Sequence, residues 1–238
     1  MKYLSLLAGA AAGALLMAAC GSGDTPATAQ DTPEVVETVT AVELDPSLAD
    51  AATGAYTLDK THAFLTFTIG HSTGISDYTV NFTDFDVDMS FDPADPAASS
   101  LSVTIDPSAL YVNYPGDYLA GHGDSGFESW TEDLAYSERF MNANEYPEIT
   151  FTSTEMTVTG SDTGTITGDL TFLGQTKPVT LDVTYNGLAT PPWNPESSIV
   201  GFNASTTITR SEWGMGVAMG WLTDEVVVEF SGEFSPAQ

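Results

Sequence analysis

Apolar and polar residues alternate with a period of two along most of this chain from Tyr56 onward. Over residues 84–91, aspartate or serine occupies every second position, and phenylalanine, valine or methionine lies between them. Successive side chains of a β-strand point to opposite faces, so the pattern predicts strands with one face in water and one in an apolar interior. Strands of this kind are typical of antiparallel sheets, whereas parallel strands are buried on both faces. We therefore expect an all-β, antiparallel fold.

The breaks between the alternating segments support this topology. Residues 159–164 and 173–176 are short, turn-rich breaks of hairpin length, so the strands on either side of each should pair as neighbours. The exception is the stretch from residue 111 to 147, in which residues 128–139 have helical composition and Pro147 marks the return to strand. About eight strands with one helical insertion favour a closed barrel, because closure removes exposed edges. The pattern alone leaves an open sandwich as the alternative.

The first twenty residues resemble a bacterial lipoprotein signal peptide. A positive Lys2 precedes an apolar stretch from Leu4 to Met17, and small residues lead to Cys20. Gly21 follows, rather than the aspartate that some bacteria read as an inner-membrane retention signal. We therefore expect lipidation of Cys20 and attachment to the bacterial cell envelope, at the outer membrane and facing the periplasm. An ordinary secretory signal with an incidental cysteine is the alternative.

The segment after the signal is poor in the residues that build a core. Residues 21–54 contain no aromatic side chain and are rich in alanine, threonine, proline and acidic residues. Such a segment buries too little apolar area to offset its conformational entropy. The predicted organisation is a signal peptide at 1–20, a disordered acidic tether at 21–54, in which a short helix around 45–52 is compatible with the sequence, and one domain at 55–238.

Charge and cysteine content exclude several classes of function. The chain has 33 acidic and 5 basic residues, and the basic residues are scattered singly. Nucleic-acid binding needs clustered lysine and arginine, so DNA and RNA are not expected partners. The acidity is typical of a salt-adapted, soluble surface, and membrane contact should come only through the lipid anchor. With Cys20 as the only cysteine, a lipidated chain retains no thiol for a disulfide or for catalysis.

Candidate catalytic and metal-ligating residues do not form a known pattern. The three histidines, His62, His71 and His122, lack a two-histidine helical spacing, so we expect no metal site. Ser125 lies near His122 and an aspartate, but no strand-to-helix nucleophile elbow surrounds it, and residues 121–126 are predicted to be a mobile acidic loop. The loop from Trp213 to Trp221 has two interpretations, core packing or a flexible apolar gate over a cavity.

Several segments together resemble the YceI-like periplasmic proteins, whose fold is a lipocalin-like antiparallel β-barrel. Thr176-Lys177-Pro178-Val179-Thr180 is the most specific of them. The matching segments are residues 56–59, 62–64, 67–71, 82–91, 139–142, 146–147, 149–154 and 168–181. The resemblance implies a barrel that holds a long isoprenoid or fatty amphiphile without catalysis. Val80 in place of a usual glycine, and a longer segment at 114–130, depart from the family pattern.

The leading functional hypothesis is therefore a tethered carrier or store of a polyisoprenoid, an isoprenoid quinone or a fatty acid derivative, with no other cofactor. His71 lies at a strand end, where it either binds the ligand headgroup or is a rim histidine satisfied by the backbone. The predicted ligand-binding residues are Phe67, Ile69, His71, Phe85, Met89, Phe151, Leu170, Val183, Phe202, Trp213 and Phe230. The alternative is a structural or adhesion barrel with a filled core, since both need the same inward residues. An enzyme that uses His71 ranks third, and the sequence leaves a homodimer open.

Overall fold

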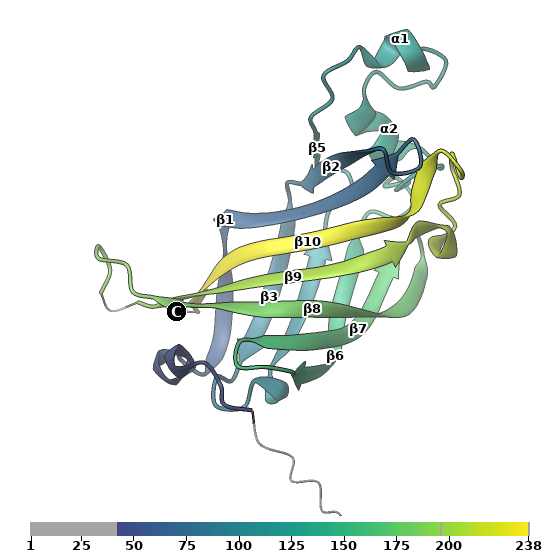
Figure 1. The fold of residues 1–238 in the computed structure, drawn as a ribbon. Helices are drawn as coiled ribbons and strands as arrows, with labels where there is room; N and C mark the ends of the chain where they lie inside the picture. The colour runs from purple at the N-terminus through teal and green to yellow at the C-terminus, as the bar shows by residue number, and fades with distance from the viewer. Residues whose placement is uncertain (1–41, 196, 238) are drawn as a thin grey trace, which may run out of the picture. The chain divides into compact units, whose positions relative to one another are not determined.

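The computed structural model describes residues 42–195 and 197–237 (Figure 1). The predicted signal peptide, the lipidation site Cys20 and the tether up to residue 41 lie outside this part of the chain. The strands and helices are β1 (Gly54–His71), β2 (Ser76–Phe82), β3 (Phe85–Phe91), β4 (Ser100–Ile105), β5 (Leu110–Val112), α1 (Tyr118–His122), α2 (Trp130–Tyr136), β6 (Ile149–Val158), β7 (Thr163–Phe172), β8 (Gln175–Ala189), β9 (Ile199–Thr209) and β10 (Leu222–Pro236). Short 3-10 helices are η1 (Pro46–Asp50), η2 (Pro96–Ala98) and η3 (Arg210–Trp213).

Eight of the strands close into an antiparallel barrel, which confirms the predicted fold class and excludes the open sandwich. The ring runs β1-β3-β4-β6-β7-β8-β9-β10, and β10 pairs with β1 to close it. The two hairpins predicted from the short breaks are present as β6–β7 and β7–β8. We call the end where β1 finishes and β10 begins the loop end, and the opposite end, beside η1, the η1 end.

The long strand β1 changes partner along its length. Residues 54–57 pair with β3, whereas residues 65–71 pair with β2, which in turn pairs with β5. The sheet therefore splays at the loop end, where β2 and β5 leave the ring (Figure 1). The helical insertion follows β5 at this end.

The helical insertion contains two short helices, where the sequence predicted one helix over 128–139 and a mobile loop over 121–126. Side chains at both helix starts explain their positions. The Asp117 carboxylate accepts the Leu119 N–H at 3.1 Å before α1, and the Ser129 hydroxyl accepts the Glu132 N–H at 3.2 Å before α2. The first two residues of the expected loop, Gly121 and His122, instead end α1, where the His122 ring stacks on Tyr118, and residues 123–126 follow the helix as turns and bends. No helix of the described residues has the length and apolar character needed to cross a membrane.

The last part of the predicted tether, residues 42–53, packs against the barrel. Leu48 is buried in η1, the Asp45 N–H donates to the Ser161 carbonyl at 2.8 Å, and the Ser47 and Tyr185 hydroxyls lie 3.1 Å apart. Leu44 packs against the same core, so two leucines four residues apart hold this segment to the η1 end. The composition of residues 21–54 as a whole does not reveal this pair, and residues 42–53 therefore belong to the packed domain.

Gly168 on β7 permits a close contact within the barrel wall. A Cβ added there would clash with the ring of Phe151 on β6 and would lie 2.5 Å from the Thr152 carbonyl oxygen. We expect Gly168→Ala to lower the free energy of unfolding by about 1–3 kcal/mol, the usual cost of overpacking. Urea denaturation measures the change. Gly121→Ala is the control, since an added Cβ there meets no atom within 4 Å, and an equal effect of the two substitutions would contradict the prediction.

Candidate functional site

The inside of the barrel is hollow. Every inward residue of β3 is buried. On β8, by contrast, the inward residues Val179, Leu181 and Val183 are only half-buried, although they point into the barrel. These residues border a cavity of about 650 Å³, which we call the lumen. Volumes of about 300–1,000 Å³ are typical of small-molecule sites. The interior is therefore not filled by its own side chains.

All eight strands of the ring contribute apolar side chains to the lumen wall. Of the eleven residues proposed from the sequence, ten line it, namely Phe67, Ile69, His71, Phe85, Met89, Phe151, Leu170, Val183, Phe202 and Phe230. The period-two pattern identified them because it separates inward from outward positions on each strand. Leu44 and Leu48 border the lumen at the η1 end.

Trp213 is the exception, because it does not reach the lumen. Its side chain is 3% exposed and packs on Phe172, with ring centroids 5.9 Å apart, while the Lys177 ammonium lies 4.9 Å from its ring. Of the two interpretations of the 213–221 loop, core packing thus holds for Trp213. Met215, Val217 and Trp221 of the same loop do line the lumen.

His71 contacts Trp221 at the loop end. The Trp221 indole N–H donates to His71 Nε2 at 3.1 Å, and His71 Nδ1 lies 2.9 Å from the Ser72 hydroxyl. Because Nε2 accepts a hydrogen bond, the proton of the neutral ring is on Nδ1. Both ring nitrogens are therefore occupied by side chains, rather than by the backbone as the rim interpretation expected, and neither is free to bind a headgroup.

An ion pair between a buried carboxylate and a half-exposed arginine anchors the helical insertion at the loop end. Asp133 on α2 is fully buried, and its two carboxylate oxygens each lie 2.9 Å from Arg139 Nη2. The Tyr118 hydroxyl donates to the same carboxylate at 2.8 Å. Beside this cluster, the His122 ring lies against Trp130, with centroids 4.6 Å apart. His122, Trp130 and Arg139 all border the lumen.

Among the described residues, Arg210 is the most buried basic group. Its side chain is 2% exposed, borders the lumen and follows directly after β9. It donates to the carbonyls of Thr223 at 2.8 Å, Met215 at 2.8 Å and Val217 at 2.7 Å. Sequence reasoning treated Arg210 only as one of the scattered basic residues. Arg210 continues the inward positions Phe202, Ala204 and Ile208 at a spacing of two, so the alternation of β9 was the signal that could have placed it on the lumen wall.

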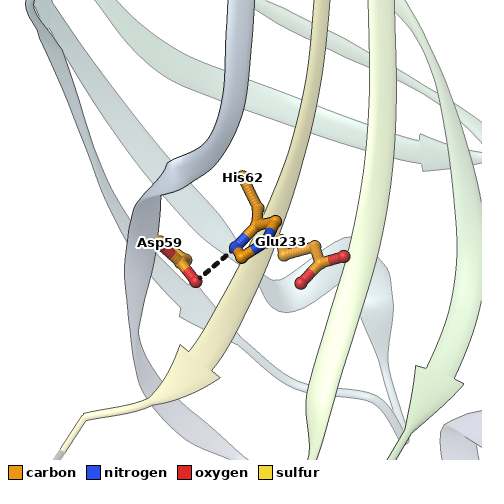
Figure 2. Close-up of side chains that lie close together, drawn as sticks. All are labelled: Asp59, His62 and Glu233. Atoms are coloured by element: carbon orange, nitrogen blue, oxygen red, sulfur yellow. Dashed lines mark hydrogen bonds and ion pairs between the residues drawn. The ribbon is translucent and has the colours of Figure 1, made fainter.

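One group of potential metal ligands lies on the outer surface (Figure 2). Ligand atoms of Asp59, His62 and Glu233 lie within 4.8 Å of one another. Asp59 already accepts from the Thr61 N–H at 2.9 Å and contacts His62 Nδ1 at 2.9 Å. Since these contacts use both carboxylate oxygens and the His62 side chain is exposed, we interpret the group as a solvated hydrogen-bonded pair with a nearby glutamate.

The Asp59–His62 pair should depend on pH. Hydrogen bonds from Thr61 and His62 lower the pKa of Asp59 to about 2, and Asp59 raises the pKa of His62. Stabilisation through Asp59 is thus lost as pH falls toward about 2, and stabilisation through His62 is lost as pH rises through its raised pKa. We expect Asp59→Asn to lower the His62 pKa in an NMR titration. Asp169→Asn on β7 is the control, and an unchanged His62 titration in Asp59→Asn would refute the assignment.

An antiparallel eight-stranded barrel with an apolar lumen is the architecture of ligand-binding barrels. Residues 56–234 match the YceI-like domain, and the chain belongs to this family. A UPF0312 protein of Pseudomonas putida strain F1 is 36% identical over 171 residues, which cover 71% of this chain and 80% of that protein. A UPF0312 protein of Pseudomonas savastanoi pv. phaseolicola is 33% identical over 171 residues, with the same coverage.

Solved structures share the fold. The crystal structure of Burkholderia cenocepacia BcnA superposes with a TM-score of 0.60 at 21% identity, and it covers 76% of this chain and 99% of that chain. The Campylobacter jejuni YCEI protein superposes with a TM-score of 0.55 at 23% identity, with coverage of 69% and 88%. At these identities the likeness shows the shared fold alone.

Proposed function

We propose that this protein binds a long-chain amphiphile in the lumen and carries or stores it without catalysis. The observation that carries the proposal is the apolar cavity of about 650 Å³ enclosed by the ring of strands. A polyisoprenoid, an isoprenoid quinone or a fatty acid derivative has the chain length and apolar character that such a wall favours. Lipidation of Cys20 would hold the carrier at the outer membrane, facing the periplasm.

The energetics of binding follow from the composition of the wall. Each methylene group removed from water contributes about 0.8 kcal/mol. Phenylalanine and methionine side chains, such as Phe67, Phe202 and Met89, adapt to chains of varied shape because they offer apolar area without directional bonds. A long chain should therefore bind tightly even before any contact with its headgroup.

Extraction of protein purified gently from its own host tests the proposal. Native mass spectrometry should show a bound mass, and organic extraction should release a long-chain lipid in a ratio near one per barrel. An Ala204→Trp variant is the matched control, because an indole at this inward position occupies part of the lumen. A wild-type barrel that carries no lipid and takes up none from vesicles would favour the structural or adhesion role.

A further inference from the structure

The charged and imidazole side chains of the lumen wall are distributed unequally between its two ends. The basic and imidazole side chains on the described wall are His71, His122, Arg139 and Arg210. His71 ends β1, Arg210 follows β9, and the other two belong to the helical insertion and its connection to β6, so all four lie at the loop end (Figure 1).

The η1 end has the opposite character. Asp162 is the acidic residue on the described wall there, beside Tyr185. Burial raises the pKa of the Tyr185 hydroxyl, and the negative charges of Asp45 and Asp50 add to this effect. An anion would therefore be disfavoured at the η1 end, both by burial and by like charge.

At the loop end, three of the four groups already have hydrogen-bond or ion-pair partners. Arg139 is paired with the fully buried Asp133 through two 2.9 Å contacts. His71 uses both ring nitrogens. His122 Nδ1 lies 3.2 Å from the Tyr118 carbonyl oxygen, an acceptor only, so the neutral ring keeps its proton there and presents an acceptor at Nε2.

Arg210 differs because its charge is buried without an ion pair. Within the described chain, no carboxylate oxygen lies within 4.0 Å of its guanidinium nitrogens. Asp224 is the nearby carboxylate, and it accepts the Ser211 N–H at 2.9 Å and the Ser211 hydroxyl at 2.6 Å. Burial lowers the pKa of Arg210, and Asp224 offsets only part of that effect.

Carbonyl groups satisfy the N–H donors of Arg210 but do not cancel its charge. A guanidinium has five N–H donors, and four hydrogen bonds to carbonyls are present, the longest to Leu222 at 3.4 Å. A buried cation without a counter-ion is unfavourable, and in an apolar lumen its field is poorly screened. An anion at the loop end would offset this cost.

We propose that the lumen selects amphiphiles with an anionic headgroup, which lies at the loop end beside Arg210 while the chain extends toward the η1 end. The shared chemistry is a carboxylate or a phosphate on a long apolar chain. This inference rests on the proposed lipid-binding function and narrows it. Arg210 can have two roles, binding the carbonyls of the 215–223 loop and attracting an anionic headgroup. A preference for a charged ligand is expected only from the second role.

Displacement of a neutral fluorescent probe from delipidated protein tests the selection. Palmitate is compared with hexadecanol, and geranylgeranyl monophosphate with geranylgeraniol, so each pair differs only in the headgroup. We expect the acid of at least one pair to bind about 10- to 100-fold more tightly than its alcohol, the range that hydrogen bonds to charged groups support. The pair with the larger ratio distinguishes a carboxylate from a phosphate ligand.

Variants assign the preference to Arg210. Arg210→Gln should bring the acid-to-alcohol ratio close to one, and Arg210→Lys should retain most of it. Lys177→Gln is the control, because it removes one positive charge at the same end from a residue that does not line the lumen. For a readout independent of variant folding, the pKa of bound palmitate carrying a ¹³C carboxyl group is measured by NMR. A nearby cation lowers this pKa, whereas burial in an apolar lumen without a cation raises it.

The outcomes are distinct. Equal affinity for acid and alcohol in the wild-type protein, or a raised carboxyl pKa, overturns the selection but leaves the chain-binding function intact. An acid preference that persists in Arg210→Gln overturns the role of Arg210. Failure of all four probes to bind overturns both the inference and the proposed function.

Discussion

Ala204→Trp is expected to abolish long-chain binding while the barrel stays folded. Ala204 lies on β9 and lines the lumen. Its partners on the two adjacent strands are Val183 of β8 and Phe230 of β10. An indole at this position would occupy space needed by several methylene groups. If five methylenes are displaced at about 0.8 kcal/mol each, affinity should fall about a thousandfold. Fluorescence displacement measures affinity, and urea denaturation measures stability.

The neighbouring residue supplies a matched control. Asn203 is exposed on the same strand and has the opposite orientation, so Asn203→Trp adds the same side chain outside the lumen. This variant should bind like the wild-type protein. If the interior were packed, Ala204→Trp would instead destabilise the fold by about 1–3 kcal/mol through overpacking, and no ligand affinity would be lost.

Arg139→Met is expected to cause the largest loss of stability. It removes the guanidinium that contacts both oxygens of the fully buried Asp133, and only the Tyr118 hydroxyl then remains on that carboxylate. Breaking a fully buried pair by deleting one partner typically costs about 3–5 kcal/mol, because an unpaired buried charge remains. Since Arg139 itself is half exposed, we expect a loss toward the lower end of this range. Urea denaturation gives the total loss, and hydrogen exchange of α2 shows whether the helical insertion opens first.

The effect of charge alone is separated by Arg139→Lys. Lysine keeps the positive charge but lacks the planar fork of the guanidinium, so its loss of stability should be smaller than that of methionine. Arg139 is more than half exposed, with a side-chain exposure of 52%, whereas Asp133 has none. The burial of the Asp133 carboxylate thus governs the loss of stability. Equal stability of Arg139→Met and the wild-type protein would show that the ion pair does not stabilise the helical insertion.

Much of the lumen wall was predictable because it depends on a local rule. Alternation fixes which side chains of one strand share a face, and this identified Phe67, Met89, Val183 and Phe202 as inward residues of their own strands without knowledge of the fold. The same rule does not apply between strands. Trp213 and Trp221 belong to one glycine-rich loop, and their different environments follow from contacts with Phe172 and His71, which are distant in sequence.

The sequence by itself determined the antiparallel strands, their inward faces and the family, because each depends on local periodicity or on short motifs. The expected lipid anchor at Cys20 also depends on sequence alone and lies outside the described residues. Tertiary structure decided that the barrel is hollow and that the Arg210 guanidinium binds loop carbonyls rather than a carboxylate. The reason is geometric: a filled core and a lumen require the same inward residues, and only the closure of the ring, together with the splay of β2 from β3, sets the distance between opposite walls.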